Sequence, residues 1–310
     1  MSESPSRFRI GVPEVAIVAS LAGLAWWLWP EAVVVPDTRW QCGHPDNAQL
    51  DMCFVEIPGG TFTMGVQATD PDAPGHDPDA EPHEGPPHRV DLGAYWITET
   101  EVIVGAYRMC VEAGGCSEDE VSTAGGFSTY YPVAEAFDPQ QDTMPVNSVS
   151  WQGAADFCAW IGGRLPTEAE WEFAARGPEA RRWPWGSEPH CAVPNSDDPF
   201  HRLRDAFVDH CAQDGPVRAR ALPNKSPFGV IGMAGNLWEW TADWYADDAY
   251  TQHSRRDPTG PSSGDRRAQR GGGWTTTTPT EIRATVRGGL APDAQLNDVG
   301  FRCVIGGVHG

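Results

Sequence analysis

Hydrophobic and polar residues follow several patterns along the chain, and each predicts a different kind of element. Residues 15–29 (VAIVASLAGLAWWLW) form an uninterrupted run of apolar or small side chains. Residues 54–64 (FVEIPGGTFTM) alternate, which predicts a β-hairpin turned by the Pro-Gly-Gly at 58–60. Beyond residue 180, short aromatic segments are separated by glycine, proline and asparagine, as is typical of irregular strands. Because helical spacing occurs earlier in the chain, the pattern predicts an α+β domain.

Three helices are predicted between residues 104 and 177. Ser150 is placed to cap a helix over 151–161, where Trp151, Cys158 and Ile161 share one face and a Gly-Gly pair follows. Thr167 and Glu170 form a capping box that opens the next helix, which the glycine at 177 ends. A weaker helical pattern covers residues 104–111. The helices therefore precede most of the predicted strands.

The apolar run at 15–29 indicates export from the cytoplasm. It is shorter than the roughly twenty residues that cross a bilayer core, and Arg7 and Arg9 precede it. Two interpretations compete, a cleaved signal peptide and a retained signal anchor. We favour the anchor, because tryptophans crowd the best small-residue cleavage position and suit a membrane interface. The predicted organisation is a cytoplasmic tip and transmembrane anchor at 1–36, a linker at 37–51, and a domain at 52–305 in the periplasm or at the cell surface.

The charge balance excludes nucleic acid as a main partner. The chain has 22 basic and 43 acidic side chains and a net charge of −21. A surface this acidic repels phosphate backbones, and the cluster of Arg266, Arg267 and Arg270 is too small to form a basic stripe. With 34 glycines and 28 prolines, much of the chain is predicted to be loop.

The acidic stretch at 70–87 has one feature of a calcium loop. Asp70, Asp72, Gly75 and Glu81 fall at EF-hand positions 1, 3, 6 and 12. A proline occupies one ligand position, however, and no flanking helical pattern is visible. We favour a solvated surface loop over an EF-hand here.

The eight cysteines are all expected to form disulfides outside the cytoplasm. None lies in a C-x-x-C motif, so the sequence supports neither a zinc ribbon nor a thioredoxin-like redox site. Eight cysteines allow 105 connectivities. Proximity in sequence suggests three pairs and leaves a fourth: Cys42–Cys53, Cys110–Cys116, Cys191–Cys211 and Cys158–Cys303.

Several sequence blocks together resemble the sulfatase-modifying-factor family, whose best-known members are formylglycine-generating enzymes. The blocks are 62–65 (FTMG), 81–83 (EPH) with 87–90 (PHRV), 145–151 (PVNSVSW), 163–172 (GRLPTEAEWE), 183–186 (WPWG), 232–240 (GMAGNLWEW), 270–274 (RGGGW) and 300–303 (GFRC). They occur in the family's order and cover about residues 52–305. The resemblance implies a disulfide-stabilised variant of the C-type-lectin-like fold with little regular secondary structure. It also implies the Cys158–Cys303 pair, which matches a family disulfide.

The resemblance does not carry the family's catalytic site over to this chain. Formylglycine-generating enzymes hold copper with two cysteines, and soft thiolates suit reduced copper. Thr276 and Glu281 stand at those two positions here, and Gly273 stands in place of a serine. Copper is therefore not expected, and no catalytic residue is assigned. We favour a polar groove over a site for a harder metal or a Glu281 base, with these groove positions: Thr276, Glu281, Trp238, Trp274, Arg283 and Arg287.

Calcium is the metal that the resemblance favours, in a structural role. Family members carry calcium near the GN-WEW block and near a preceding Asn–Asp pair, and oxygen ligands suit this ion. A side-chain ligand of the first site is replaced by Gly232 here. An alternative is that the disulfides alone hold these loops. The matching residues are Gly235, Leu237 and Glu239 for the first site, and Asn195, Ser196, Asp209 and Cys211 for the second.

The function is harder to predict than the fold, because membership of a family does not determine which reaction, if any, a protein catalyses. The leading interpretation is a membrane-anchored domain that binds a peptide, protein or glycan, or acts as a scaffold, without generating formylglycine. A second is an oxidoreductase of the family with an altered active site, comparable to its periplasmic pyoverdine-maturation members. A third is a partner of sulfatases that binds their peptide without oxidising it.

Overall fold

The computed structural model describes residues 52–124, 126–135, 138–188, 215–222 and 224–306. The predicted anchor and linker lie outside these residues, as do Cys42, Cys191 and Cys211. Within the described residues, no helix is both long and apolar enough to cross a membrane.

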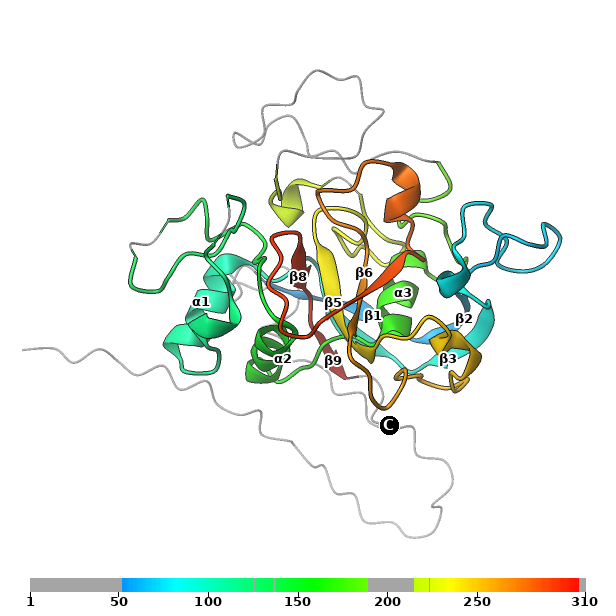
Figure 1. Cartoon of the computed structure of the whole chain (residues 1–310), viewed down its shortest axis with the longest axis horizontal. Coiled ribbons are helices and arrows are strands. Elements are labelled where there is room, and N and C mark those ends of the chain that lie inside the picture. The colour runs from blue at the N-terminus through cyan, green and yellow to red at the C-terminus, as the bar shows by residue number, and fades with distance from the viewer. Residues whose placement is uncertain (1–51, 125, 136–137, 189–214, 223, 307–310) are drawn as a thin grey trace, which may run out of the picture.

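The described residues form small sheets with helices on their flanks, joined by long loops (Figure 1). One sheet has the order β1-β4-β9, a second pairs β2 with β3, and the third has the order β7-β6-β5-β8. The α-helices are α1 (Val104–Glu112), α2 (Trp151–Trp160) and α3 (Glu168–Arg176). The strands are β1 (Phe54–Ile57), β2 (Gly60–Met64), β3 (His88–Leu92), β4 (Tyr95–Thr98), β5 (Trp238–Trp244), β6 (Arg267–Arg270), β7 (Arg287–Leu290), β8 (Val299–Phe301) and β9 (Val304–Gly306).

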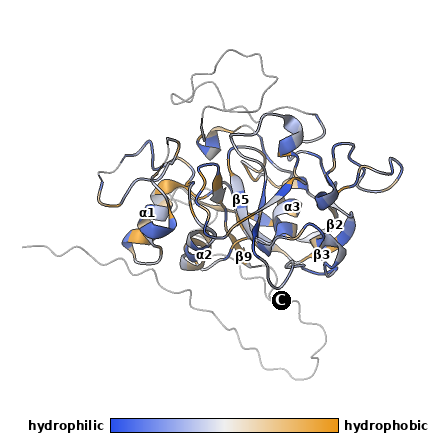
Figure 2. Ribbon diagram, viewed as in Figure 1, coloured by the Kyte–Doolittle hydropathy of each residue, from blue (hydrophilic) through white to orange (hydrophobic). Residues whose placement is uncertain are grey.

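Two large hydrophobic clusters hold these elements together. The first joins α1 and α2 to β8, and the rings of Tyr107 and Phe157 stack there beside Phe301. The second packs α3 on β2, with Phe173 5.0 Å from Phe62 between ring centroids. Hydrophobic and hydrophilic stretches alternate along α1 (Figure 2), as expected for a helix with one buried face. Burial of aromatic side chains therefore stabilises a domain that has little regular structure.

The predicted helices are confirmed, together with their capping residues. The Ser150 hydroxyl accepts a hydrogen bond from the Gly153 amide at the start of α2. At α3, Thr167 and Glu170 form the reciprocal capping box, and Gly177 ends the helix with a φ of 66°. These interactions satisfy amide groups that have no partner within the helix.

The hairpin predicted at residues 54–64 is wrong, although both of its strands exist. β1 pairs with β4, whereas β2 pairs with β3 in a different sheet. Between them, Gly59 and Gly60 adopt φ angles of 68° and 150°. A Cβ on Gly59 would lie only 2.7 Å from the carbonyl carbon of Gly93, so the chain turns closely past the β3–β4 connection. The turn therefore directs β1 and β2 to separate sheets rather than pairing them.

Two of the predicted disulfides are confirmed. Cys110 is bonded to Cys116 beside the end of α1, and Cys158 of α2 is bonded to Cys303 just before β9. Cys53 is also disulfide-bonded. Its predicted partner, Cys42, lies outside the described residues, as does the predicted pair Cys191–Cys211.

Candidate ligand-binding site

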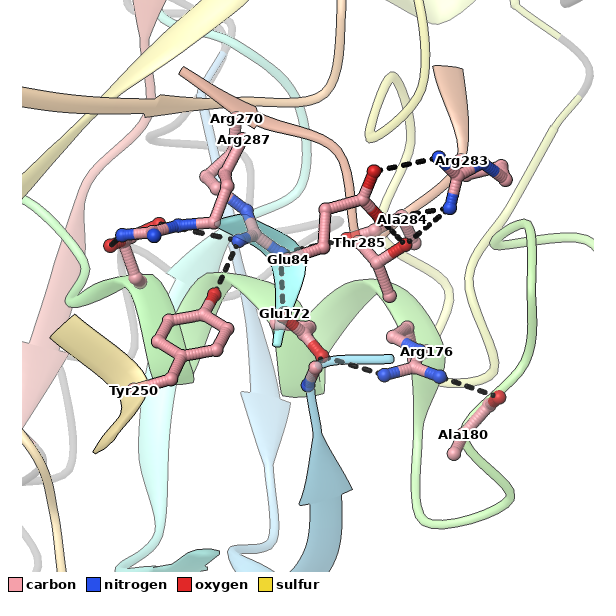
Figure 3. Close-up of polar contacts among 12 residues, drawn as sticks. Glu84, Glu172, Arg176, Ala180, Tyr250, Arg270, Arg283, Ala284, Thr285 and Arg287 are labelled. Atoms are coloured by element: carbon pink, nitrogen blue, oxygen red, sulfur yellow. Dashed lines mark hydrogen bonds and ion pairs between the residues drawn. The ribbon is translucent and has the colours of Figure 1, made fainter. Parts of the chain in front are cut away.

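A buried ionic cluster connects α3 to strands β6 and β7 (Figure 3). Glu168 and Glu172 lie four residues apart on α3, and Arg270 contacts both carboxylates, at 3.2 Å and 2.6 Å. Arg287 binds Glu168 at 2.6 and 2.9 Å, and Arg176 binds Glu172 at 2.6 Å. All five charged side chains are buried. Each charge therefore has an opposite charge as its partner, which offsets much of the cost of burial.

The protonation states in this cluster follow from the balance of burial and pairing. Burial acts to raise the pKa of Glu168, but Arg287 and Arg270 outweigh it and lower that pKa. Burial acts in the same way on Glu172, and Arg270 and Arg176 lower its pKa. Both carboxylates are thereby kept ionised, which is the requirement for holding the three arginines in place.

Arg283 and Arg287 do not line an open groove, contrary to the expectation from sequence. Both are 2% exposed. Arg283 binds Glu84 at 2.7 and 2.8 Å and Asp77 at 3.2 Å, while Arg287 is held by Glu168 and the carbonyl oxygen of His83. A guanidinium that is buried with an acidic partner is not available to a ligand, so these two residues belong to the internal framework.

The loop after β6 contains the two positions where the family has its copper-binding cysteines. The Thr276 hydroxyl accepts a hydrogen bond from the Gly273 amide at 3.2 Å, and the Thr276 amide donates to the Gly273 carbonyl at 3.0 Å. Glu281 closes the capping box of the short helix η7 (Pro279–Ile282) by accepting from the Thr277 and Thr278 amides. Both side chains therefore shape the loop itself.

The donor set at these positions does not fit reduced copper. A hydroxyl and a carboxylate are hard oxygen ligands, whereas copper(I) prefers thiolate or thioether sulfur. Thr276 is buried, Glu281 is exposed, and each is already engaged by backbone amides. No step of an oxidation can be assigned to this pair.

Next to this loop lies a partly exposed group of side chains, which we call the Trp274 surface. The Trp274 ring lies 4.7 Å from the Phe127 ring, and its indole N–H donates to the Asn297 carbonyl at 3.0 Å. A Cβ on Gly273 would lie 3.1 Å from both Trp238 and the Cβ of Asp298, so these two side chains are close neighbours. The Trp274 surface comprises Phe127, Trp238, Trp274 and Asp298.

The structure thus separates the predicted groove residues into two sets. Trp238 and Trp274 are half-buried, and Trp238 lies beside Gly273, the residue before Trp274, whereas Arg283 and Arg287 lie in the interior. Phe127 and Asp298 were not predicted as site residues, and no motif in the sequence indicates them. They reach the surface near Trp274 because Asn147, in the PVNSVSW block, ties their loops together: its side-chain amide donates to the carbonyls of Phe127 and Asn297.

The predicted calcium ligands are placed only in part. Glu239 is buried and accepts hydrogen bonds from Arg302 at 2.6 and 2.7 Å and from the Trp171 indole at 2.7 Å. Its carboxylate is thus the partner of an arginine, and calcium binding would have to compete with these donors. Gly235 and Leu237 are also buried. The second set (Asn195, Ser196, Asp209 and Cys211) lies outside the described residues, and calcium stays a prediction.

The stretch at 70–87 forms a surface loop tied to the domain by acidic side chains. Asp77 and Asp79 pair with Arg182, and Glu84 pairs with Arg283. Asp70, Asp72 and Glu81 are exposed, and the segment from 65 to 87 holds only a three-residue 3₁₀ helix, Pro82–Glu84. Over the described part of the chain, no group of three or more His, Cys, Asp or Glu side chains is arranged to hold a metal ion.

The arrangement of small sheets, few helices and long loops is the C-type-lectin-like fold in the variant found in formylglycine-generating enzymes. The chain belongs to this family: the sulfatase-modifying factor enzyme 1-like domain matches residues 44–306. It is 33% identical to a formylglycine-generating enzyme of Thermomonospora curvata over 294 residues, covering 81% of this chain and 92% of the relative. It is 32% identical to the inactive Cα-formylglycine-generating enzyme 2 of Mus musculus over 311 residues, covering 86% and 88%.

The comparison with solved structures gives the same fold. The structure of PvdO from Pseudomonas aeruginosa aligns with a TM-score of 0.62 at 23% identity, covering 82% of this chain and 94% of PvdO. At this level of identity the likeness concerns the fold alone.

Proposed function

We propose that this protein is a non-oxidising member of its family, which binds a peptide or protein ligand at the Trp274 surface. The observation that carries the proposal is the pair Thr276 and Glu281 at the two positions where the family has its copper cysteines. Their oxygens accept hydrogen bonds from the amides of their own loop. The family also includes a mouse relative named as inactive, at 32% identity, so loss of activity has a precedent within it.

The proposed ligand site follows from what surrounds this loop. Aromatic side chains that are partly exposed and rigidly held are typical anchors of a binding surface. Trp274 is fixed by its indole hydrogen bond to Asn297 and by a backbone hydrogen bond from its amide to the Asn236 carbonyl at 2.6 Å. A preorganised surface of this kind loses little side-chain entropy when it binds a ligand.

The experiment that tests the lack of oxidation uses purified full-length protein, copper(I) and a sulfatase-type cysteine peptide. We expect no tight copper(I) binding, no oxygen consumption and no aldehyde on the peptide. The double variant Thr276→Cys/Glu281→Cys is the matched control, because it restores two soft ligands to the loop and should regain copper(I) affinity. Formylglycine formation by the wild-type protein, lost on Glu281→Ala, would instead establish an oxidoreductase with an altered site.

We further propose that the domain lies outside the cytoplasm on an N-terminal membrane anchor. The apolar run at 15–29 with Arg7 and Arg9 before it supports this, because positive residues favour the cytoplasmic side. In fractionated cells that express the full chain, the protein should remain in the membrane pellet after carbonate and high-salt washes. Release by either wash, or a mature protein that begins after the apolar run, would contradict the anchor.

A further inference from the structure

Glu101 is a buried carboxylate whose two oxygen atoms have different surroundings. The residue lies between β4 and α1, and its side chain is fully buried. Oε1 accepts a hydrogen bond from the Asn236 side-chain amide at 2.9 Å. Oε2 is buried as well, and it has no hydrogen-bond partner among the described residues. Because a buried polar atom without a partner is costly, this oxygen is a candidate ligand for a cation.

The unpartnered oxygen of Glu101 lies against the backbone of Gly232. A Cβ added to Gly232 would lie 2.6 Å from Oε2. In an aspartate or asparagine, a side-chain oxygen lies about 2.4 Å from its own Cβ by standard bond lengths. Oε2 of Glu101 is therefore at nearly the distance that a side-chain oxygen of residue 232 would have. Position 232 is also where glycine replaces the side-chain calcium ligand that the family resemblance implies.

The segment that follows Gly232 provides further oxygen atoms without a donor. It contacts the Glu101 carboxylate at two points, at Gly232 and through the Asn236 side chain. Within the described residues, the carbonyl oxygens of Gly235 and Leu237 accept no backbone hydrogen bond. Both residues are buried. Carboxylate and carbonyl oxygens are the ligands that calcium prefers in proteins.

Glu239, the carboxylate within the same sequence block, already has a positive partner. Arg302 donates to both of its oxygens, at 2.6 and 2.7 Å, and the Trp171 indole donates to Oε2. No such ion pair involves Glu101 in the part of the chain that the structure describes. The carboxylate whose charge remains for a cation is therefore that of Glu101.

We propose that Glu101 is a ligand of a calcium ion bound at residues 232–237. It supplies the carboxylate oxygen that glycine at 232 lacks, and the carbonyls of Gly235 and Leu237 would be further ligands. Calcium suits these donors better than magnesium does, because it accepts irregular sets of carboxylate and carbonyl oxygens. Magnesium requires a nearly octahedral set and usually keeps several waters.

This position connects the proposed ion to the Trp274 surface. Asn236 binds Glu101 through its side chain, and its carbonyl oxygen accepts from the Trp274 amide at 2.6 Å. A cation that fixes the 232–237 segment would therefore also stabilise the backbone that carries Trp274. The calcium site does not depend on the proposed peptide ligand, and the test below needs no such ligand.

The test compares thermal unfolding of purified full-length protein in EDTA and in calcium at about 10 mM, roughly 100 times the dissociation constant of a weak extracellular site. We expect calcium to raise the Tm of the wild type by about 5 °C. Glu101→Gln keeps the shape of the side chain and an oxygen for Asn236, but removes the charge. It should lose most of the shift and, by isothermal titration calorimetry, bind calcium at this site at least about tenfold more weakly.

Glu99→Gln is the matched control, because it removes a carboxylate of the same loop that already pairs with Arg220. It should keep the wild-type calcium shift. The second predicted calcium site lies outside the described residues, so the difference between Glu101→Gln and wild type measures the site at 232–237. An unchanged shift in Glu101→Gln, or no shift in the wild type, would overturn the proposal. An equal shift with magnesium would overturn the assignment to calcium.

Discussion

At the scale of single residues, this domain places many charged side chains in its interior, and their neighbours decide their protonation. Glu168, Glu172 and Glu239 each bind an arginine. Asp243 differs from them, because its Oδ2 accepts from the Glu168 amide while its buried Oδ1 has no hydrogen-bond partner. Burial and the negative charge of Glu168 raise the pKa of Asp243 to about 8. The folded protein thus favours the protonated form of the Asp243 carboxyl group.

Asp243 is predicted to make the domain less stable as the pH rises toward 8. Its pKa is higher in the folded state (about 8) than the ordinary value of 3.8, so the folded state binds the proton more tightly. This contribution to the free energy of unfolding is full below about pH 4 and declines up to about pH 8. Denaturant titrations across this range should show a weaker decline in Asp243→Asn. Asp293→Asn, at an exposed site, should retain the wild-type slope.

At the scale of elements, helix α3 is the central support of the domain. All nine of its residues are buried, and it contacts β2, β5 and β6. Its first turn is held by the capping box and by Arg164, which binds both oxygens of Glu170 at 2.6 and 2.7 Å. The same turn carries Glu168 into the ionic cluster with Arg287. Loss of the N-terminal cap would therefore affect both the helix and the ionic cluster.

Thr167→Ala should lower the free energy of unfolding by about 1 kcal/mol, the usual cost of losing a side-chain N-cap. The Thr167 hydroxyl accepts from the Glu170 amide at 3.1 Å, and alanine leaves that buried amide without its partner. Thr167→Ser keeps the oxygen and should cost much less. Chemical denaturation followed by circular dichroism gives both values. An alanine variant as stable as the serine variant would show that the hydroxyl contributes nothing measurable.

At the scale of the whole molecule, the two described disulfides close loops of very different length. Cys158–Cys303 joins residues 145 positions apart and connects α2 to the start of β9. Cys110–Cys116 joins residues six positions apart at the end of α1. A cross-link restricts the unfolded chain more when the loop that it closes is longer. The long-range disulfide is therefore the one that stabilises the domain as a whole.

Removing each disulfide separately should show this difference. By loop-closure entropy, Cys158→Ala/Cys303→Ala should lose about 5 kcal/mol of unfolding free energy, and Cys110→Ala/Cys116→Ala about 2 kcal/mol. Urea denaturation of the two double variants measures both losses against the wild type. Equal losses would mean that local packing around the sulfur atoms, rather than chain entropy, sets the contribution of each bond.

The amino-acid sequence by itself determined the local features of this protein. The starts of α2 and α3 were predicted because Ser150, Thr167 and Glu170 satisfy backbone amides only a few residues away. Cys110–Cys116 was predicted from sequence proximity, and Cys158–Cys303 from the remaining cysteines and the family resemblance. The family and its fold followed from the ordered sequence blocks, and the match to residues 44–306 confirms them.

Only the tertiary structure decided which distant residues meet. The alternating pattern over β1 and β2 predicted a hairpin. In the structure β1 pairs with β4 and β2 pairs with β3, so the two strands lie in separate sheets. Arg283 and Arg287 were predicted to line a groove. In the structure Glu84 binds Arg283 and Glu168 binds Arg287 in the interior, and each pair is separated by more than 100 positions in the sequence. Phe127 and Asp298 reach the Trp274 surface because Asn147 holds their loops together. Contacts over such separations depend on packing of the whole chain, and local patterns of hydrophobic and polar residues do not encode them.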